Sequence, residues 1–398
     1  MAAPSRDFLS TLPPELLGDI FSACASLHAD APLILGAVSR LFRQVAHSTP
    51  RAWTHLLLDA QTPSSGSLKA ALFSELSRVC PLRVRLDLRS RGRQAGSGNV
   101  HVPGLGNALR AHTTRFDALE LLVNEQKDAV DTLGAIYSGL ASEETGLLAL
   151  RALRIDATKK SKPGPLSTTV PVHPPIAFPA VPTIEDLETT NIALDLLPSL
   201  GLENLTSLRV LQPLLAAPLS ADHIVDLLRS APRLRKFWVD ARVGDSDSHT
   251  DSETVLVSMP ELEELHLRTN NLIPLLDRLS LPRLNTLFLD DMDGNRPGAS
   301  EEVAGALYRL LVRTEDGGDE KGNSELREFE LVGVAVDRET EMWGKCLQKM
   351  RALVGFRVGD DSTAVEAAVA ATQLVDAWNA QKRGSRSFSP GFGWAGDI

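Results

Sequence analysis

The chain has 398 residues, of which 43% are hydrophobic, so it can bury a sizeable core; its length predicts roughly two to three domains. Its 51 acidic and 41 basic residues give a formal net charge of −10. This balance argues against a general nucleic-acid binder, whose surface would be basic. Three widely spaced cysteines, Cys24, Cys80 and Cys346, make neither a disulfide framework nor a paired metal motif, which fits a reducing compartment.

The first residues lack the basic and apolar regions of a secretory signal. No run approaches the roughly 20 apolar residues that a membrane-spanning helix needs. We therefore expect an intracellular protein, in the cytoplasm, the nucleus or both, with neither a membrane nor a nucleic acid as partner.

Residues 11–58 are predicted to form a compact helical unit. Pro13 and Pro14 stand where a helix can begin, because the first N–H groups of a helix have no partner within it. Apolar residues follow at helical spacing up to Cys24, and a second periodic run extends from Leu35 to Ala46. Fewer than fifty residues cannot easily bury so many large apolar side chains among themselves, so we expect some of them to contact a partner or the downstream domain.

Three strings in this region, LPPELLGDIF, AVSRLFRQVA and STPRAWTHL, follow one another at the spacing of the F-box. The region resembles that family, in particular the divergent F-box-like proteins of fungi, although Ser39 and Phe42 replace its usual Cys and Trp. The resemblance implies binding to a Skp-type adaptor and, through it, to the cullin of a ubiquitin ligase. The residues that it assigns to the adaptor surface are Leu12, Pro13, Leu16, Leu17, Ile20, Val38, Leu41 and Phe42. The alternative is that these helices simply cap the domain behind them.

From Arg83 onward, a short phrase of alternating apolar residues recurs. Its most complete copy, LEELHLRTNNL at residues 262–272, matches the leucine-rich-repeat pattern at every fixed position. Each copy is expected to form a short strand followed by a turn, and because one unit cannot cover its own apolar side, neighbours must stack as a parallel sheet. Asn270 is expected to satisfy backbone groups at its turn, and residues 221–230 and 301–312 are predicted to be helices. A generic α/β domain with leucine-rich strands is the alternative.

The predicted fold class is therefore an N-terminal all-α F-box of about three helices, followed by an irregular α/β leucine-rich-repeat-like solenoid. The predicted divisions are an F-box-like domain at 1–58, the solenoid at 59–361, a capping helix at 362–383 and a disordered tail at 384–398.

One glycine pattern, at residues 391–396, fits a phosphate-binding loop formally, but no strand is expected before it and no helix after it. No other spacing typical of a catalytic site or of a complete metal site is present, so we expect neither an enzyme nor a cofactor. The hypothesis is a substrate-recognition adaptor of a Skp–cullin–F-box ubiquitin ligase, which joins the Skp-type adaptor to an unknown target protein. The alternative is a non-degradative leucine-rich-repeat scaffold. Arg89, Arg91 and Arg93 form either a solvated loop or a docking surface for an acidic partner. The residues expected to bind the target, on the concave strand face, are Arg235, Trp238, Glu264, His266, Arg268 and Phe288.

Overall fold

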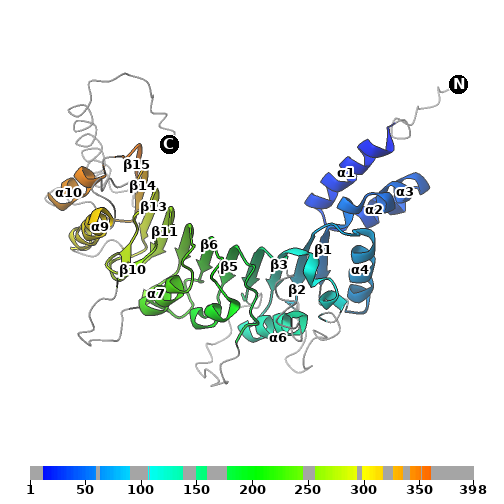
Figure 1. Cartoon of the computed structure of the whole chain (residues 1–398), viewed down its shortest axis with the longest axis horizontal. Coiled ribbons are helices and arrows are strands. Elements are labelled where there is room, and N and C mark those ends of the chain that lie inside the picture. Colours follow the sequence, from blue (N-terminus) through cyan, green and yellow to red (C-terminus); the bar gives the residue numbers. More distant parts are fainter. Residues whose placement is uncertain are drawn as a thin grey trace. The chain divides into compact units, whose positions relative to one another are not determined.

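The computed structural model describes residues 12–59, 63–89, 106, 108–137, 149–158, 177–244, 256–293, 298–316, 326–334, 341–350 and 352–359. The chain forms two compact units. Figure 1 labels helices and strands of both units. The first comprises Met1–Ala216 and Arg229–Leu234, and the second comprises Ala217–Leu228 and Arg235–Ile398. The expected capping helix at 362–383 and tail at 384–398 lie outside the described residues.

The first unit begins with helices and continues as strands separated by helical segments. Its helices are α1 (Pro14–Leu27), α2 (Ala31–Val38), α3 (Arg40–Ser48), α4 (Pro63–Leu76) and α6 (Gln126–Tyr137). Short 3-10 segments are η2 (Pro50–Trp53), η3 (Thr113–Arg115) and η5 (Leu194–Leu200). Its strands are β1 (His55–Asp59), β2 (Leu82–Asp87), β3 (Phe116–Leu122), β4 (Ala152–Asp156), β5 (Asp186–Thr190) and β6 (Ser207–Leu211).

The second unit also alternates strands with helices. Its helices are α7 (Ala221–Arg229), whose last residue falls in the first unit, α8 (Ile273–Leu276), α9 (Ala299–Asp316) and α10 (Glu341–Lys349). Its longer strands are β8 (Lys236–Asp240), β11 (Glu264–Thr269), β13 (Thr286–Asp291), β14 (Glu328–Val332) and β15 (Gly355–Gly359). Two-residue strands are β7 (Leu219–Ser220), β9 (Val243–Gly244), β10 (Val257–Ser258) and β12 (Leu279–Ser280).

The longer strands belong to one 11-stranded sheet, in the order β1-β2-β3-β4-β5-β6-β8-β11-β13-β14-β15. Pairing is parallel within each unit, for example between β2 and β3 and between β11 and β13. The short strands pair separately, β7 with β9 and β10 with β12. The expectation of parallel strands is therefore confirmed.

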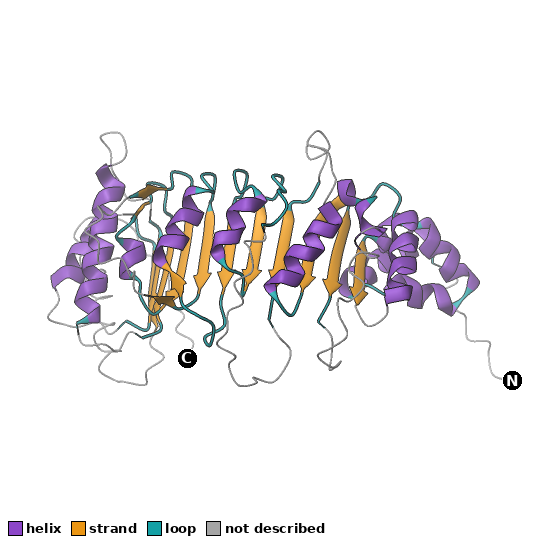
Figure 2. Cartoon of the chain, turned by 90° about the horizontal axis from the view of Figure 1, so that it is seen from below, coloured by secondary structure: helices purple, strands orange, loops and turns teal. Residues whose placement is uncertain are grey.

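Each strand buries alternate side chains, because successive residues of a strand point to opposite faces of the sheet. In β2, Leu82, Val84 and Leu86 are buried, whereas Arg83 and Arg85 are exposed. In each unit, helices that follow the strands, such as α6 and α7, lie along one face of the strands (Figure 1 and Figure 2). The core therefore lies between the strands and these helices, and charged residues occupy the opposite face of the strands.

The expected fold class, an all-α F-box followed by an irregular leucine-rich-repeat-like solenoid, is wrong. The structure is an α/β fold dominated by one parallel sheet of 11 strands, with helices distributed along it. Among the described residues, the connecting helices range from four residues in α8 to 18 in α9, so the connections between strands do not share one length. Alternating leucines occur in any sheet with one buried face, which is why the pattern did not separate the two alternatives. The α/β domain with leucine-rich strands is the alternative that the structure supports.

Through Trp53, the N-terminal helices share a core with α4, the helix that follows β1. Trp53 is buried, and its indole N–H donates a 2.7 Å hydrogen bond to the carbonyl of Ala46 in α3. Its ring also packs edge to face against Phe73 of α4, at a centroid distance of 5.1 Å. The boundary expected after residue 58 falls inside β1, which pairs with β2 along its whole length.

Arg115 closes the C-terminal end of α4. Its guanidinium donates to the carbonyl oxygens of Ser74 and Cys80, at 3.0 and 2.9 Å, and to the hydroxyl of Ser77 at 2.6 Å. The last carbonyls of a helix have no partner within the helix and need such donors when they are shielded from water. Arg115 thus links α4 to the start of β3. Local sequence patterns do not predict this contact, because its partners lie far apart in the chain.

The turn after β11 is organised by an asparagine, as expected. The Asn270 side-chain oxygen accepts a 2.7 Å hydrogen bond from the backbone N–H of Val243. In the first unit, Asn191 follows β5 and donates to the carbonyl of Ala157 at 3.0 Å. Amide side chains thus satisfy backbone groups beyond the strand ends, where the ladder of backbone hydrogen bonds stops.

Candidate interaction surfaces

The described residues contain no group of three or more His, Cys, Asp or Glu side chains able to hold a metal ion. Cys346 is buried, and its thiol donates to the carbonyl of Ala304 at 3.3 Å. Burial raises the pKa of Cys346 to about 12, so this thiol remains protonated at neutral pH and is a poor nucleophile. Three surfaces of the described residues are suited to binding other molecules.

The first candidate surface lies on α1, α2 and α3. Of the thirteen large hydrophobic side chains that are exposed among the described residues, seven lie between Leu16 and Leu41. Leu16 is 50% exposed and Ile20 is 46% exposed, and their i, i+4 spacing places them on one face of α1. We define the exposed apolar set of α1–α3 as Leu16, Ile20, Leu33, Ile34, Val38 and Leu41.

The core of these helices is filled by other side chains. Phe21 is buried in α1 and contacts the partly buried Phe42 of α3 edge to face, at a centroid distance of 5.2 Å. Leu17 is only 2% exposed, so it contributes to this core and is not part of the surface on which it was expected. Among the other residues expected there, Pro13 is exposed and Leu12 is half-buried.

Ser39 separates α2 from α3, which the sequence had suggested as one continuous run. Its backbone is extended, and its hydroxyl accepts a 3.1 Å hydrogen bond from the N–H of Phe42. Serine is a favoured residue at a helix N-cap because it satisfies such a donor. Arg43 joins the two helices by donating to the carbonyl of Gly36 at 3.0 Å. Ser39 therefore ends one helix and begins the next, with Val38 in α2 and Leu41 in α3.

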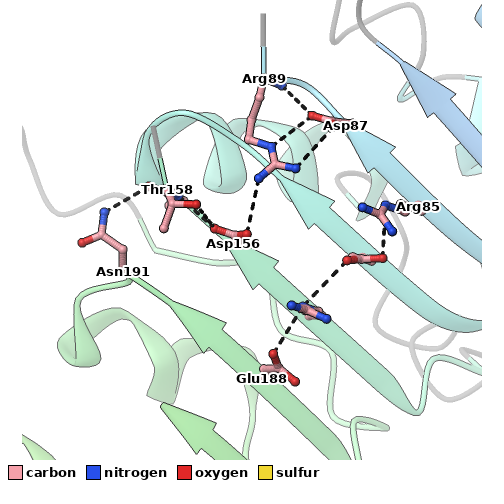
Figure 3. A network of polar contacts seen from close by, with 10 residues as sticks. Arg85, Asp87, Arg89, Asp156, Thr158, Glu188 and Asn191 are labelled. Carbon is pink, nitrogen blue, oxygen red and sulfur yellow. Dashed lines mark hydrogen bonds and ion pairs between the residues drawn. The ribbon is translucent and has the colours of Figure 1, made fainter. Parts of the chain in front are cut away.

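The second candidate surface is the face of β2 to β6 that carries charged side chains (Figure 3). One register row across these strands alternates in charge: Arg85, Glu120, Arg154, Glu188 and Arg209. The N–O distances between successive members are 3.4, 3.7, 3.3 and 3.8 Å. Exposed ion pairs contribute only about 0–1 kcal/mol each to the free energy of folding. The main effect of this row is therefore to set the alternating charges on the surface of the sheet.

A hollow of about 630 Å³ lies beside this row. The adjacent register row contains the small residues Ala118 and Ala152 between Arg83 and Asp186, which leaves space above these strands. Residues 26–30, at the end of α1 and in the turn after it, line the hollow as well. This volume lies within the usual range for ligand pockets, about 300–1,000 Å³.

His55 also lines this hollow. Partial burial and the neighbouring positive charge of Arg83 lower the pKa of His55 below its ordinary value, so its imidazole is neutral at neutral pH. The hollow therefore offers a neutral imidazole together with guanidinium and carboxylate groups, a combination suited to recognising a polar side chain.

Arg89 lies at the ends of β2 and β4, close to this surface (Figure 3). Its guanidinium forms ion pairs with Asp87 at 3.1 Å and Asp156 at 3.5 Å, and the side chain is only 11% exposed. Asp156 also accepts hydrogen bonds from the backbone N–H and the hydroxyl of Thr158. Arg89 is therefore committed to two carboxylates of its own chain; Arg91 and Arg93 lie outside the described residues.

The third candidate surface belongs to the second unit. Five of the six residues expected to bind a target lie on its strands, at positions that point away from the core: Trp238, Glu264, His266, Arg268 and Phe288. The register places Trp238, His266 and Phe288 next to one another. Arg235 precedes β8, and its guanidinium lies 3.8 Å from the carboxylate of Glu261.

The sequence interpretation missed the hollow and the charged row of the first unit. Ala118 and Ala152 are small residues at outward positions of successive strands, and this was the available signal. It becomes visible only once the two strands are placed in register, because the residues lie more than thirty positions apart in the chain.

None of the helices in the described ranges is both long and apolar enough to cross a membrane. A scan against models of known protein families and a search of curated proteins both gave no match for the chain.

Proposed function

We propose that the chain is a substrate-recognition adaptor of a Skp–cullin–F-box type ubiquitin ligase. In this proposal, α1, α2 and α3 bind the Skp-type adaptor, and the charged and aromatic faces of the strands bind a target protein. The chain itself performs no chemistry, and it acts in the cytoplasm, the nucleus or both.

The observation that carries the proposal is the exposed apolar set of α1–α3. These side chains face solvent although Phe21, Val45 and Trp53 already fill a core beneath them. Exposed apolar groups gathered in a short segment are typical of surfaces that bind another protein. The strings that resemble an F-box lie in the same segment, which supports a Skp-type adaptor as the partner.

The energetics favour a small number of anchors. A stable interface buries about 1,600 Å² in total, and a few central apolar residues supply most of its binding energy. Leu16 and Ile20 are suited to this role because they are adjacent on a helix whose opposite side is packed against its own core.

Such an adaptor acts by positioning. Holding the ligase scaffold through one surface and a target through another raises the effective concentration of target lysines near the site of ubiquitin transfer. This mechanism requires two separate surfaces and no catalytic group on the chain. The proposal assigns these two roles to the apolar set of the first unit and to the strand face of the second unit.

Co-purification tests the proposal. The tagged full-length chain, mixed with a purified Skp-type adaptor and cullin, is expected to elute with both proteins as one complex in size-exclusion chromatography. A chain that binds the adaptor but never recruits the cullin would instead be the non-degradative scaffold. Failure to bind the adaptor at micromolar concentrations would overturn both the function and the partner proposed here.

A further inference from the structure

A row of three rings crosses the exposed face of β8, β11 and β13. Trp238, His266 and Phe288 occupy paired positions on these strands, and all three are partly exposed. The centroids of Trp238 and His266 lie 5.1 Å apart with their planes at 61°, and those of His266 and Phe288 lie 5.5 Å apart, nearly parallel at 25°. We call these three residues the aromatic row.

The aromatic row is surrounded by more carboxylates than cations. The described residues at outward positions of β8, β11, β13, β14 and β15 include five acids, Asp240, Glu264, Asp290, Glu328 and Glu330, and three bases, Lys236, Arg268 and Arg357.

Each of these three bases is already in an ion pair with one of the acids. Lys236 lies 2.7 Å from Glu264, and Arg357 lies 3.8 Å from Glu330. Arg268 is shared between two carboxylates, Asp240 at 3.5 Å and Asp290 at 3.2 Å. The face therefore has a negative excess beside its aromatic surface.

We propose that the aromatic row binds an extended, arginine-rich segment of a partner protein. A guanidinium group stacks on aromatic faces and pairs with carboxylates at the same time, so one side chain satisfies both features of this surface. The negative excess disfavours nucleic acid, although nucleic-acid bases also stack on aromatic rings. The inference rests on the proposed function, because it names the class of target segment that the second unit would recognise.

The dimensions of the row fit a short stretch of chain. Its centroid spacings of 5.1 and 5.5 Å correspond to about three residues of an extended chain, which rises about 3.3 Å per residue. Asp240 and Asp290 belong to the register row next to the rings, on the strands of Trp238 and Phe288. A segment lying along the rings would thus place its basic side chains within reach of these carboxylates, where they would compete with Arg268.

Fluorescence anisotropy tests the proposal with the full-length chain and a short labelled peptide in which arginine alternates with serine. We expect this peptide to bind at least roughly tenfold more tightly than peptides carrying citrulline or glutamate in place of arginine. Trp238→Ala with Phe288→Ala should weaken binding by a similar factor, whereas Trp238→Phe should retain most of it. Val354→Ser, at an exposed position of the same unit outside the row, serves as the matched control.

Equal affinity for the arginine, citrulline and glutamate peptides would overturn the inference. Unchanged affinity of the double alanine variant would do the same, and so would tighter binding of a single-stranded oligonucleotide than of the arginine peptide. Adaptor capture separates this failure from failure of the proposed function, because the Trp238 and Phe288 variants leave α1, α2 and α3 intact.

Discussion

Replacing Leu16 and Ile20 together with aspartate is expected to abolish capture of the Skp-type adaptor. Central apolar anchors contribute about 2 kcal/mol or more each, or about 4 kcal/mol for the pair, so the affinity should fall by roughly 1,000-fold. The new carboxylates would be buried in the interface without partners, which adds a desolvation cost. Isothermal titration calorimetry with purified adaptor measures the change directly.

The helices should survive these substitutions. Both side chains are about half exposed in the free chain, and position 16 lies in the first turn of α1, where a negative charge interacts favourably with the helix dipole. Far-ultraviolet circular dichroism should therefore match the unmodified chain. Val79→Asp is the control, because Val79 is 90% exposed in the turn after α4, outside the apolar set. A double variant that still bound the adaptor with unchanged affinity would remove the apolar set from the interface.

Trp53→Ala is expected to cause the largest loss of stability among single substitutions in the first unit. Truncating a buried tryptophan costs about 3–5 kcal/mol through lost burial and the cavity that remains. The Ala46 carbonyl would also lose its 2.7 Å hydrogen bond from the indole. Urea denaturation followed by circular dichroism should show the transition of the first unit at a clearly lower urea concentration.

The contacts of Trp53 imply that its loss also weakens adaptor binding. Its ring lies between α3 and α4, against Phe73 at 5.1 Å and His47 at 6.0 Å. Without it, α3 loses one of its packing partners, and adaptor affinity should fall although Trp53 itself is buried. Trp53→Phe keeps much of the ring volume and loses the N–H donor, so it should be intermediate in both measurements. An unaltered urea transition in Trp53→Ala would contradict the role given to this residue.

Local patterns predicted the elements better than their assembly. Alternating apolar residues identified most of the strands, and the helices expected at 221–230 and 301–312 are present as α7 and α9. Pro32 lies in the first turn of α2, where proline is tolerated because its missing N–H would have no partner there. Ser39 was a visible N-cap signal that the helical period obscured.

The fold class could not be inferred from the repeated leucines. Apolar residues at every second position show which side chains of a strand are buried. They do not show how one strand is connected to the next, because that depends on the residues between the strands. These vary from the short α8 to the long α9. Residues 55–58 were expected in the helical unit, whereas their pairing with β2 places them in β1, the first strand of the sheet.

The candidate surfaces differ in how far they could be predicted. The aromatic row combines Trp238, His266 and Phe288, which were all selected from the sequence as variable residues between strand leucines. The charged row and the hollow depend on register between strands separated by long connections, and no local pattern carries that information. Leu17 was expected on the adaptor-binding surface but is buried. Helical periodicity identifies an apolar stripe on a helix, but it does not identify which edge of the stripe faces the core.

The most direct measurement of the central claim is hydrogen–deuterium exchange of the full-length chain with and without the purified Skp-type adaptor. Binding through α1, α2 and α3 predicts slower exchange in residues 14–48, because a bound partner suppresses the local opening that exposes their amides. It predicts no change in β8, β11 and β13. If a complex forms and residues 14–48 exchange at the same rate as in the free chain, the adaptor binds elsewhere and the proposed docking surface is wrong.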